Sequence, residues 1–190
     1  MANPHAPVGF HFRPSDQEII RFFLYTMVVK REPLMLLYNN FVHVDDLFSD
    51  KEPREIWEDY GGDQLCDDEG LYFFCELKRL NLKGSYIHRK IGVGGSWSQG
   101  EPPKLVYYKD GNGNAYPIGR KRKFRYENQQ SEEHGGWHLD EYSLVGGGDG
   151  HEQNASENYY NASSSNYDSY FVICQLRKNE RSYVNKKNGR

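Results

Sequence analysis

A series of short aromatic and β-branched runs, separated by turn-forming residues, most restricts what this chain can fold into. Residues 71–77 read LYFFCEL, residues 104–116 read KLVYYKDGNGNAY, and residues 137–144 read WHLDEYSL. Runs of this length and composition favour strands. The Asp-Gly-Asn-Gly segment supplies residues that tolerate the positive φ of a tight turn. Two further runs, RKRKFRY and YFVICQLRK, continue the series toward the C-terminus, so the pattern predicts hairpins in an antiparallel sheet.

The N-terminal part has a different period. Ser15 and Glu18 have the spacing of a capping box, and Pro14 prevents a helix from entering from the preceding residues. Apolar residues then recur at steps of three and four: Ile19, Ile20, Phe23, Leu24 and Met27. We predict a helix over residues 16–30 and a short second helix over residues 33–39. The segment EPREIWEDYG predicts a helical turn with Trp57 facing inward.

These elements together predict an α+β fold. It consists of a twisted antiparallel β-sheet packed with a long N-terminal helix and one or two short helices. The length of 190 residues suits one domain with tails. A Gly-, Ser- and Asn-rich segment separates the last two strand candidates, and we predict a long mobile loop there, over residues 146–169.

Charge is divided unevenly along the chain. Residues 45–69 hold eleven acidic and two basic residues, whereas residues 78–125 hold twelve basic and two acidic ones. Residues 177–190 add six basic residues and one acidic residue. Segregated charge of this size predicts a polyanionic partner for the basic part. The alternative is that the acidic and basic segments fold against each other.

Patterns typical of enzymes and metal sites are incomplete in this sequence. The glycine-rich segments GVGGSWSQG and GNGNAYPIG complete neither a dinucleotide-binding nor a Walker A pattern. His138, Asp140 and Ser143 do not have the spacing of a triad on one strand. Cys66, Cys75 and Cys174 form no C-x-x-C pair, which argues against a structural zinc site and favours reduced thiols. We therefore expect no enzyme activity, cofactor, metal or small-molecule substrate. The sequence also lacks an apolar run long enough to span a membrane, so we expect no membrane partner.

Two basic stretches are candidates for binding phosphate. One is the strand candidate GRKRKFRY, in which alternate basic residues would share one face and could follow a phosphate backbone. A solvated edge strand protected by its charge is the alternative. The candidate residues of the two stretches are Arg120, Lys121, Arg122 and Lys123 in the first, and Arg79, Lys83, Arg89 and Lys90 in the second. The first stretch could also act as a nuclear localisation signal.

The order of several short motifs resembles the NAC domain of plant transcription factors over about residues 6–178. The family's opening Leu-Pro-Pro-Gly-Phe-Arg-Phe motif corresponds to APVGFHFRPSDQEII, and its Asp-Leu-Tyr and Glu-Pro-Trp motifs to VDDLFSDKEPREIW. Its Tyr-Phe-Phe motif is kept at residues 72–74. The later segments GRKRKFRY, HLDEYSL and FVICQLR resemble three further family motifs in the same order. On this basis we predict a tail at 1–5, a DNA-binding and dimerisation domain at 6–178, and a basic tail at 179–190.

The resemblance implies a dimer interface and a DNA-reading edge. The interface would contain Gly9, Phe10, His11, Phe12 and Glu18. Family members exchange an Arg–Glu salt bridge there, and His11 stands at the arginine position. The family's Trp-Lys-Ala-Thr-Gly segment enters the major groove, and here it reads WSQG with Ser98 in place of the lysine. Gln99 could still hydrogen-bond a base edge. Two further basic positions of the family become Leu80 and Tyr86, whereas Arg79 and Arg89 are kept.

The resemblance therefore predicts a dimeric, sequence-specific double-stranded DNA-binding protein that regulates transcription in a plant nucleus. Its partners would be DNA and a second copy of itself or a related NAC protein. The altered basic positions leave an alternative: a degenerate NAC domain that dimerises with relatives, binds DNA poorly and acts as a competitor.

Overall fold

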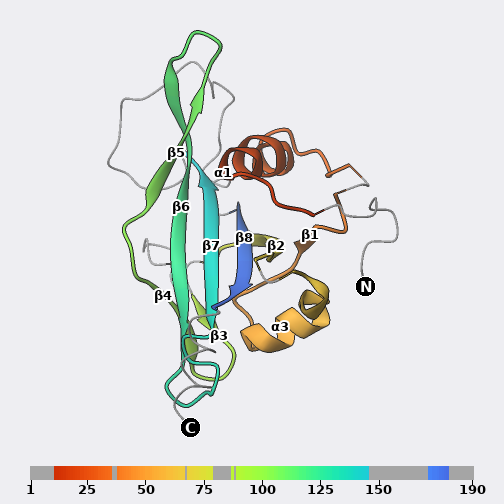
Figure 1. The fold of residues 1–190 in the computed structure, drawn as a ribbon, viewed down its shortest axis with the longest axis vertical. Helices are drawn as coiled ribbons and strands as arrows, with labels where there is room; N and C mark the ends of the chain where they lie inside the picture. Colours follow the sequence, from red (N-terminus) through yellow and green to blue (C-terminus); the bar gives the residue numbers. More distant parts are fainter. Residues whose placement is uncertain are drawn as a thin grey trace.

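The computed structural model describes residues 11–35, 38–66, 68–78, 87, 89–145 and 171–179. An eight-stranded sheet dominates this part of the chain, with the order β1-β2-β8-β7-β6-β4-β3 and with β5 also paired to β6 (Figure 1). The strands are β1 (Val42–Val44), β2 (Leu71–Glu76), β3 (Lys90–Ile91), β4 (Gly95–Gln99), β5 (Lys104–Lys109), β6 (Ala115–Glu127), β7 (Trp137–Leu144) and β8 (Phe171–Lys178). The α+β prediction is confirmed.

The sheet is mixed, and the prediction of a purely antiparallel sheet is wrong in that respect. β1 pairs with β2 in parallel, with Val42 opposite Tyr72. The segment between these two strands contains α3 (Pro53–Asp59) and the short 3-10 helix η2 (Gly62–Gln64). A parallel pair needs such a crossover, because the chain must return to the same end of the sheet before it enters the second strand.

The predicted long N-terminal helix is replaced by a shorter, irregular helical run. This run consists of α1 (Asp16–Glu18), the π-helical segment η1 (Ile19–Leu24) and α2 (Tyr25–Val28). The capping box is confirmed, because the Ser15 side chain accepts from the Glu18 amide and the Glu18 carboxylate accepts from the Ser15 amide. In the π-helical segment, the Tyr25 amide donates to the Ile20 carbonyl, five residues back.

The short second helix predicted over residues 33–39 is wrong for the described part of that segment. Residues 31–35 are irregular and residues 38–41 form a turn. Arg31 has a φ of 56°, which ends the helical run, and Pro33 disfavours helical geometry at the preceding Glu32. By contrast, α3 confirms the prediction of a helical turn, and Trp57 on it is buried.

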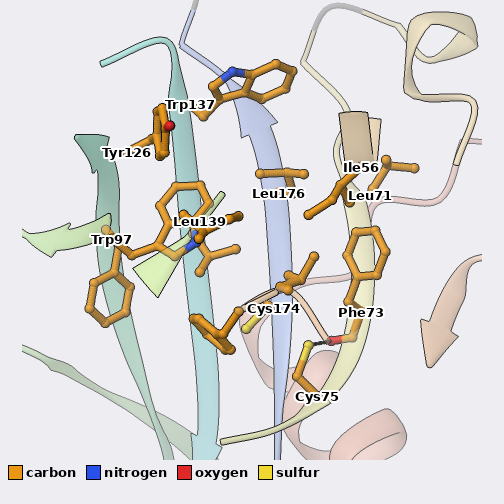
Figure 2. Packing of buried hydrophobic residues seen from close by; sticks show 14 of the residues in the cluster. Ile56, Leu71, Phe73, Cys75, Trp97, Tyr126, Trp137, Leu139, Cys174 and Leu176 are labelled. Atoms are coloured by element: carbon orange, nitrogen blue, oxygen red, sulfur yellow. Dashed lines mark hydrogen bonds between the residues drawn. The ribbon is translucent and has the colours of Figure 1, made fainter. Parts of the chain in front are cut away.

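Each face of the sheet carries its own hydrophobic cluster. Neighbouring residues of β2 illustrate this, because Phe73 joins one cluster and Tyr72 the other. The first face packs against α3, where the Trp57 and Trp137 rings lie 5.5 Å apart between centroids. Figure 2 shows this cluster around Leu139, Cys174 and Phe73. We call it the α3 face.

The second face packs against the helical run, and we call it the helical-run face. Four of the six residues of η1 are buried on it: Ile19, Ile20, Phe23 and Leu24. In Figure 1 the helical run lies near the β5 end of the long strands and α3 near the β3 end. Each helix therefore covers only part of the sheet.

The predicted loop at 146–169, the tail at 1–5 and nearly all of the tail at 179–190 lie outside the described residues. The corresponding domain boundaries stay predictions.

Candidate nucleic-acid interface

The β3–β4 edge of the sheet presents basic side chains on the helical-run face. Lys90 pairs with Ser96 on β4, and Ser98 pairs with Arg125 on β6. Because paired residues project from the same face and alternate residues do so along a strand, these side chains share that face with Lys123. Lys90, Lys123 and Arg125 are exposed, and Ser98 is half-buried. The register thus gathers three cations around the predicted DNA-reading residue Ser98.

Arg122 and Arg89 lie on the opposite, α3 face, where they hold a buried carboxylate. Glu141 of β7 is fully buried. The Arg89 Nη2 donates to both of its carboxylate oxygens, at 3.0 and 2.9 Å, and Arg122 Nη1 lies 3.5 Å from Oε1. The Arg89 guanidinium also lies 4.6 Å from the Phe124 ring centroid. Only 19% of each arginine side chain is exposed, so both side chains are largely engaged within the fold.

Lys121 is similarly engaged on the helical-run face. Its Nζ lies 2.9 Å from an oxygen of Asp16 and 3.1 Å from one of Asp140. Tyr142 donates to the same Asp16 oxygen at 2.7 Å. Burial, together with this hydrogen bond, raises the pKa of Tyr142 above its ordinary value. Lys121 therefore links the N-terminal helical turn to the middle of the sheet.

A cleft of about 330 Å³ opens beside Lys121. Lys123 and Arg177 line it together with Asp140 and Asp68. Arg177 Nη2 pairs with Asp140 at 2.8 Å. Lys123 therefore belongs both to this cleft, whose lining carries both signs, and to the cations around Ser98, whose face also holds the exposed Glu127 opposite Ser96.

The remaining predicted DNA contacts occupy varied places. Gln99 is exposed at the end of β4, and its side-chain amide donates to the Glu101 carbonyl at 2.8 Å. Arg120 is half-buried and makes contacts within the fold. Arg79 and Lys83 lie outside the described residues.

The residues predicted for the dimer interface have roles within one chain. Phe12 stacks on Phe41 with centroids 4.8 Å apart and meets the edge of Tyr72 at 5.2 Å. Glu18 completes the capping box, and hydrogen bonds from Ser15 lower its pKa. His11 is exposed, and its Nδ1 lies 2.8 Å from Oε1 of Glu69. Gly9 and Phe10 lie outside the described residues, so this interface stays a prediction.

Sequence reasoning missed the acidic partners of the basic strand. Asp140 and Glu141 are adjacent on β7 and enter opposite faces of the sheet. The signal was present, because adjacent acids in a strand next to a run of four basic residues can match them across a hairpin. The acidic segment 45–69, considered as the alternative partner, supplies Asp46 to Lys78 at 2.5 Å and Asp63 to Lys178 at 2.6 Å.

A comparison with models of known protein families identifies the family of this chain. The family model described as "No apical meristem (NAM) protein" matches residues 7–144. This match covers more than half of the 190 residues, and the chain therefore belongs to the No apical meristem family. The family is the NAC-type domain of transcription factors, and the resemblance inferred from the short motifs is confirmed. In the part of the chain that the structure describes, no helix is long and apolar enough to cross a membrane.

Proposed function

We propose that this chain is a dimeric, sequence-specific double-stranded DNA-binding protein that regulates transcription in a plant nucleus. The carrying observation is the cluster of exposed cations Lys90, Lys123 and Arg125 around Ser98, on the helical-run face near the β3–β4 edge of the sheet. Phosphate contacts from such cations fix the position of a protein on a duplex. Side chains at the strand edge would then approach the bases.

In this proposal the two neighbours at the end of β4 have different roles. Gln99 is exposed, and its amide could form a bidentate contact with an adenine edge after leaving the Glu101 carbonyl. Ser98 stands where the family has lysine, and its short side chain reaches less far toward the duplex. The engaged cations Arg89, Lys121 and Arg122 would support the sheet, while their exposed neighbours contact phosphate.

Dimerisation would use the segment that precedes the helical run. His11 and Glu18 are both exposed, so His11 of one chain could pair with Glu18 of a second copy, or with the equivalent residue of a related NAC protein. His11 would have to exchange Glu69 for the Glu18 of the partner. A protonated histidine would be the charged partner of Glu18 in that pair, at the position where the family has arginine.

One observation favours a second candidate function. Three of the predicted phosphate contacts, Arg89, Lys121 and Arg122, are largely buried against carboxylates. With these three cations engaged within the fold, the domain could dimerise with relatives while binding DNA weakly, and so act as a competitor.

Fluorescence anisotropy with labelled duplexes separates the two candidates. Oligonucleotides selected from a random pool are compared with unselected duplexes at three salt concentrations. Gln99→Ala should reduce the preference for selected sites by about 1 to 3 kcal/mol and leave the salt slope unchanged. Ser98→Lys should raise affinity, because it restores a cation at the groove. Lys109→Ala is the matched control, since this exposed lysine lies at the far end of β5.

The sequence-specific proposal would be refuted if the wild-type protein shows no preference for the selected sites and the Ser98→Lys variant shows none either. Analytical ultracentrifugation of the same samples then tests the competitor. A chain that stays monomeric at all concentrations, both alone and mixed with a related NAC protein, would refute the competitor as well.

A further inference from the structure

Three side chains of different chemistry converge beside the N-terminal segment, away from the proposed DNA-binding edge. His11 comes from the segment that precedes the helical run, and Cys66 and Glu69 come from the connection between η2 and β2. The imidazole Nδ1 of His11 lies 2.8 Å from Oε1 of Glu69 and 3.9 Å from Sγ of Cys66. The ligand atoms of all three residues lie within 4.8 Å of one another.

A turn holds the cysteine and the glutamate on the same side. The Glu69 amide donates to the Cys66 carbonyl at 2.9 Å, which closes the turn. The Cys66 amide in return donates to Oε2 of Glu69 at 3.0 Å. This bond fixes the carboxylate so that its other oxygen faces His11. Two potential ligands three residues apart on one turn have the spacing of the paired ligands found in many zinc sites.

The separations between ligand atoms are close to those around a zinc ion. Zinc–nitrogen and zinc–oxygen bonds of about 2.0 to 2.2 Å and zinc–sulfur bonds of about 2.3 Å, at tetrahedral angles, place ligand atoms roughly 3.3 to 3.6 Å apart. The distances of 2.8 and 3.9 Å lie on either side of this range. The third separation, between the Cys66 and Glu69 ligand atoms, is at most 4.8 Å, so side-chain movements of about 1 Å would bring the three atoms to suitable positions.

The charges around the cluster include one competitor for the carboxylate. Arg13 Nε lies 3.6 Å from Oε1 of Glu69, but its Nη2 pairs more closely with Asp68, at 2.5 Å. Arg13 can therefore keep Asp68 as a partner if a metal takes Glu69. The Glu69 side chain is only 8% exposed, so its negative charge is enclosed, whereas Cys66 remains open to solvent.

We propose that His11, Cys66 and Glu69 form a binding site for a borderline-soft divalent cation of the zinc class. The thiolate and the imidazole select against Mg²⁺ and Ca²⁺, which prefer oxygen ligands. Binding displaces the thiol proton of Cys66 and uses the neutral imidazole, so affinity falls at low pH. The three protein ligands leave a fourth coordination position for water or a further group. The bound metal fastens the N-terminal segment to the η2–β2 connection. The site lies apart from the DNA-binding edge, but a bound metal would hold His11 on Glu69 and so exclude its proposed contact with Glu18 of a partner chain.

The wild-type protein allows a direct test, because its three thiols differ in accessibility. Cys66 is exposed, whereas Cys75 and Cys174 are buried. Burial also raises the pKa of the Cys174 thiol, which keeps it protonated and unreactive. A thiol-specific disulfide reagent should therefore label one cysteine in the native chain, and peptide mapping should identify it as Cys66.

Zinc ions equimolar with the chain should slow this labelling at least tenfold, and EDTA should restore the original rate. Mg²⁺ at the same concentration should have no effect. Reversal by EDTA distinguishes metal protection from burial of Cys66 in a dimer. A labelling rate that does not change with excess Zn²⁺ would overturn the proposal.

Cobalt substitution with variants identifies the ligands. Co²⁺ should give a thiolate-to-metal charge-transfer absorption in the wild type at a stoichiometry of one per chain. Cys66→Ser should abolish this band, and His11→Ala or Glu69→Gln should weaken Co²⁺ binding at least tenfold. His138→Ala, a histidine on β7 outside the cluster, is the matched control and should bind as the wild type does. A charge-transfer band that persists in Cys66→Ser would assign the metal to another thiol and overturn the site. Circular dichroism establishes that each variant is folded.

Discussion

Asp140 and Glu141 are neighbours on β7, yet the two faces of the sheet treat their carboxylates differently. Glu141 enters the α3 face, where Arg89 grips both of its oxygens and the apolar cluster surrounds the pair. Asp140 enters the helical-run face, where Lys121 and Arg177 approach it beside a cleft. Both carboxylates are buried, but Glu141 lies against the apolar cluster of the α3 face, whereas the Asp140 side chain, which is 3% exposed, lines the cleft.

This difference shows how much of the basic sequence serves the fold. A charge removed from water is costly unless a cation and hydrogen bonds replace the lost solvation. Asp140 is buried as well, but it has two close cations, Lys121 at 3.1 Å and Arg177 at 2.8 Å. Glu141 has Arg89 at 2.9 Å and Arg122 only at 3.5 Å, and it therefore depends more on a single partner. The basic residues thus have three different roles. Arg89 neutralises a buried carboxylate on the α3 face, Lys121 links the helical run to the sheet on the other face, and Lys90 is exposed near the β3–β4 edge.

The largest expected effect comes from breaking the enclosed pair. Arg89→Leu leaves the buried Glu141 carboxylate with Arg122 at 3.5 Å as its remaining cation in the described part of the chain. Loss of one partner of a buried pair costs about 3 to 5 kcal/mol. Urea denaturation should show that loss in the free energy of unfolding. Arg177→Leu, which removes a partner of Asp140, should cost clearly less, because water and Lys121 can replace it.

A double variant examines the cause. In Arg89→Leu/Glu141→Leu the uncompensated charge is gone, so much of the lost stability should return. If Arg89→Leu and Arg177→Leu destabilise the chain equally, the two faces do not differ in the way their geometry suggests.

The second prediction concerns the contact between β6 and the helical run, which shapes the Asp140 side of the comparison. A Cβ atom on Gly119 would lie 2.5 Å from Cδ1 of Ile20 and 2.5 Å from the Ser143 carbonyl oxygen. The Ile20 side chain and the backbone of β7 at Ser143 would both have to shift. Gly119→Ala should therefore destabilise the chain by about 1 to 3 kcal/mol in thermal or urea unfolding.

Gly100→Ala is the matched control, because a Cβ atom there meets nothing within 4 Å. Its stability should change by less than about 0.5 kcal/mol. An equally stable Gly119→Ala variant would mean that the Ile20 side chain and the β6–β7 pairing accommodate the added methyl group at no cost.

The third prediction concerns the start of the helical run, which also brings Asp16 to Lys121. Ser15→Ala removes the hydroxyl that bonds both the Glu18 amide and its carboxylate, and should cost about 1 kcal/mol at neutral pH. Hydrogen bonds from Ser15, first from its amide and then from its hydroxyl, lower the pKa of Glu18. A lowered carboxyl pKa contributes stability above the unfolded-state value of about 4.3, which is lost as pH falls through the folded value.

The difference in unfolding free energy between wild type and Ser15→Ala should therefore shrink as pH falls from 7 through this acidic range. Chemical denaturation at several pH values measures it. A difference that is constant over this range would mean that the stability contributed by the Ser15 cap does not depend on the ionisation of Glu18.

Local patterns predicted the elements of this fold better than their partners. Ser15 and Glu18 predicted the start of the helical run, and the alternation of basic and aromatic residues around Phe124 predicted β6, because both patterns lie within a few residues of the chain. The π-helical segment was not predictable, since buried positions 19, 20, 23 and 24 suit an α-helix as well. The direction of β1 was not predictable either, because a strand of three residues carries no sign of which way its neighbour runs.

The candidate sites required contacts over long separations in the chain. Lys121 meets Asp16 across 105 residues and His11 meets Cys66 across 55, so neither spacing forms a recognisable motif. The pairing of Arg122 with Glu141 depends on the β6–β7 register. The family resemblance suggested which edge would read DNA, and the register then separated the exposed cations from those engaged with carboxylates.

The smallest expected effect on stability, and the sharpest test of the comparison, comes from Lys121 and Lys123. They lie two residues apart on one strand and share a face, but Lys121 lies between Asp16 and Asp140, whereas Lys123 is exposed. Lys123→Ala should change the unfolding free energy by less than about 0.5 kcal/mol. It should weaken binding to all duplexes alike and reduce the slope of log affinity against log salt by about one. Lys121→Ala should do the reverse, with a measurable loss of stability and an unchanged salt slope, because its charge is already neutralised by carboxylates. Anisotropy titrations at three salt concentrations, paired with urea denaturation of the same samples, measure both quantities.

If Lys121→Ala reduces the salt slope as much as Lys123→Ala does, Lys121 must leave its carboxylates to contact phosphate. The division between engaged and free cations would then describe only the chain without DNA.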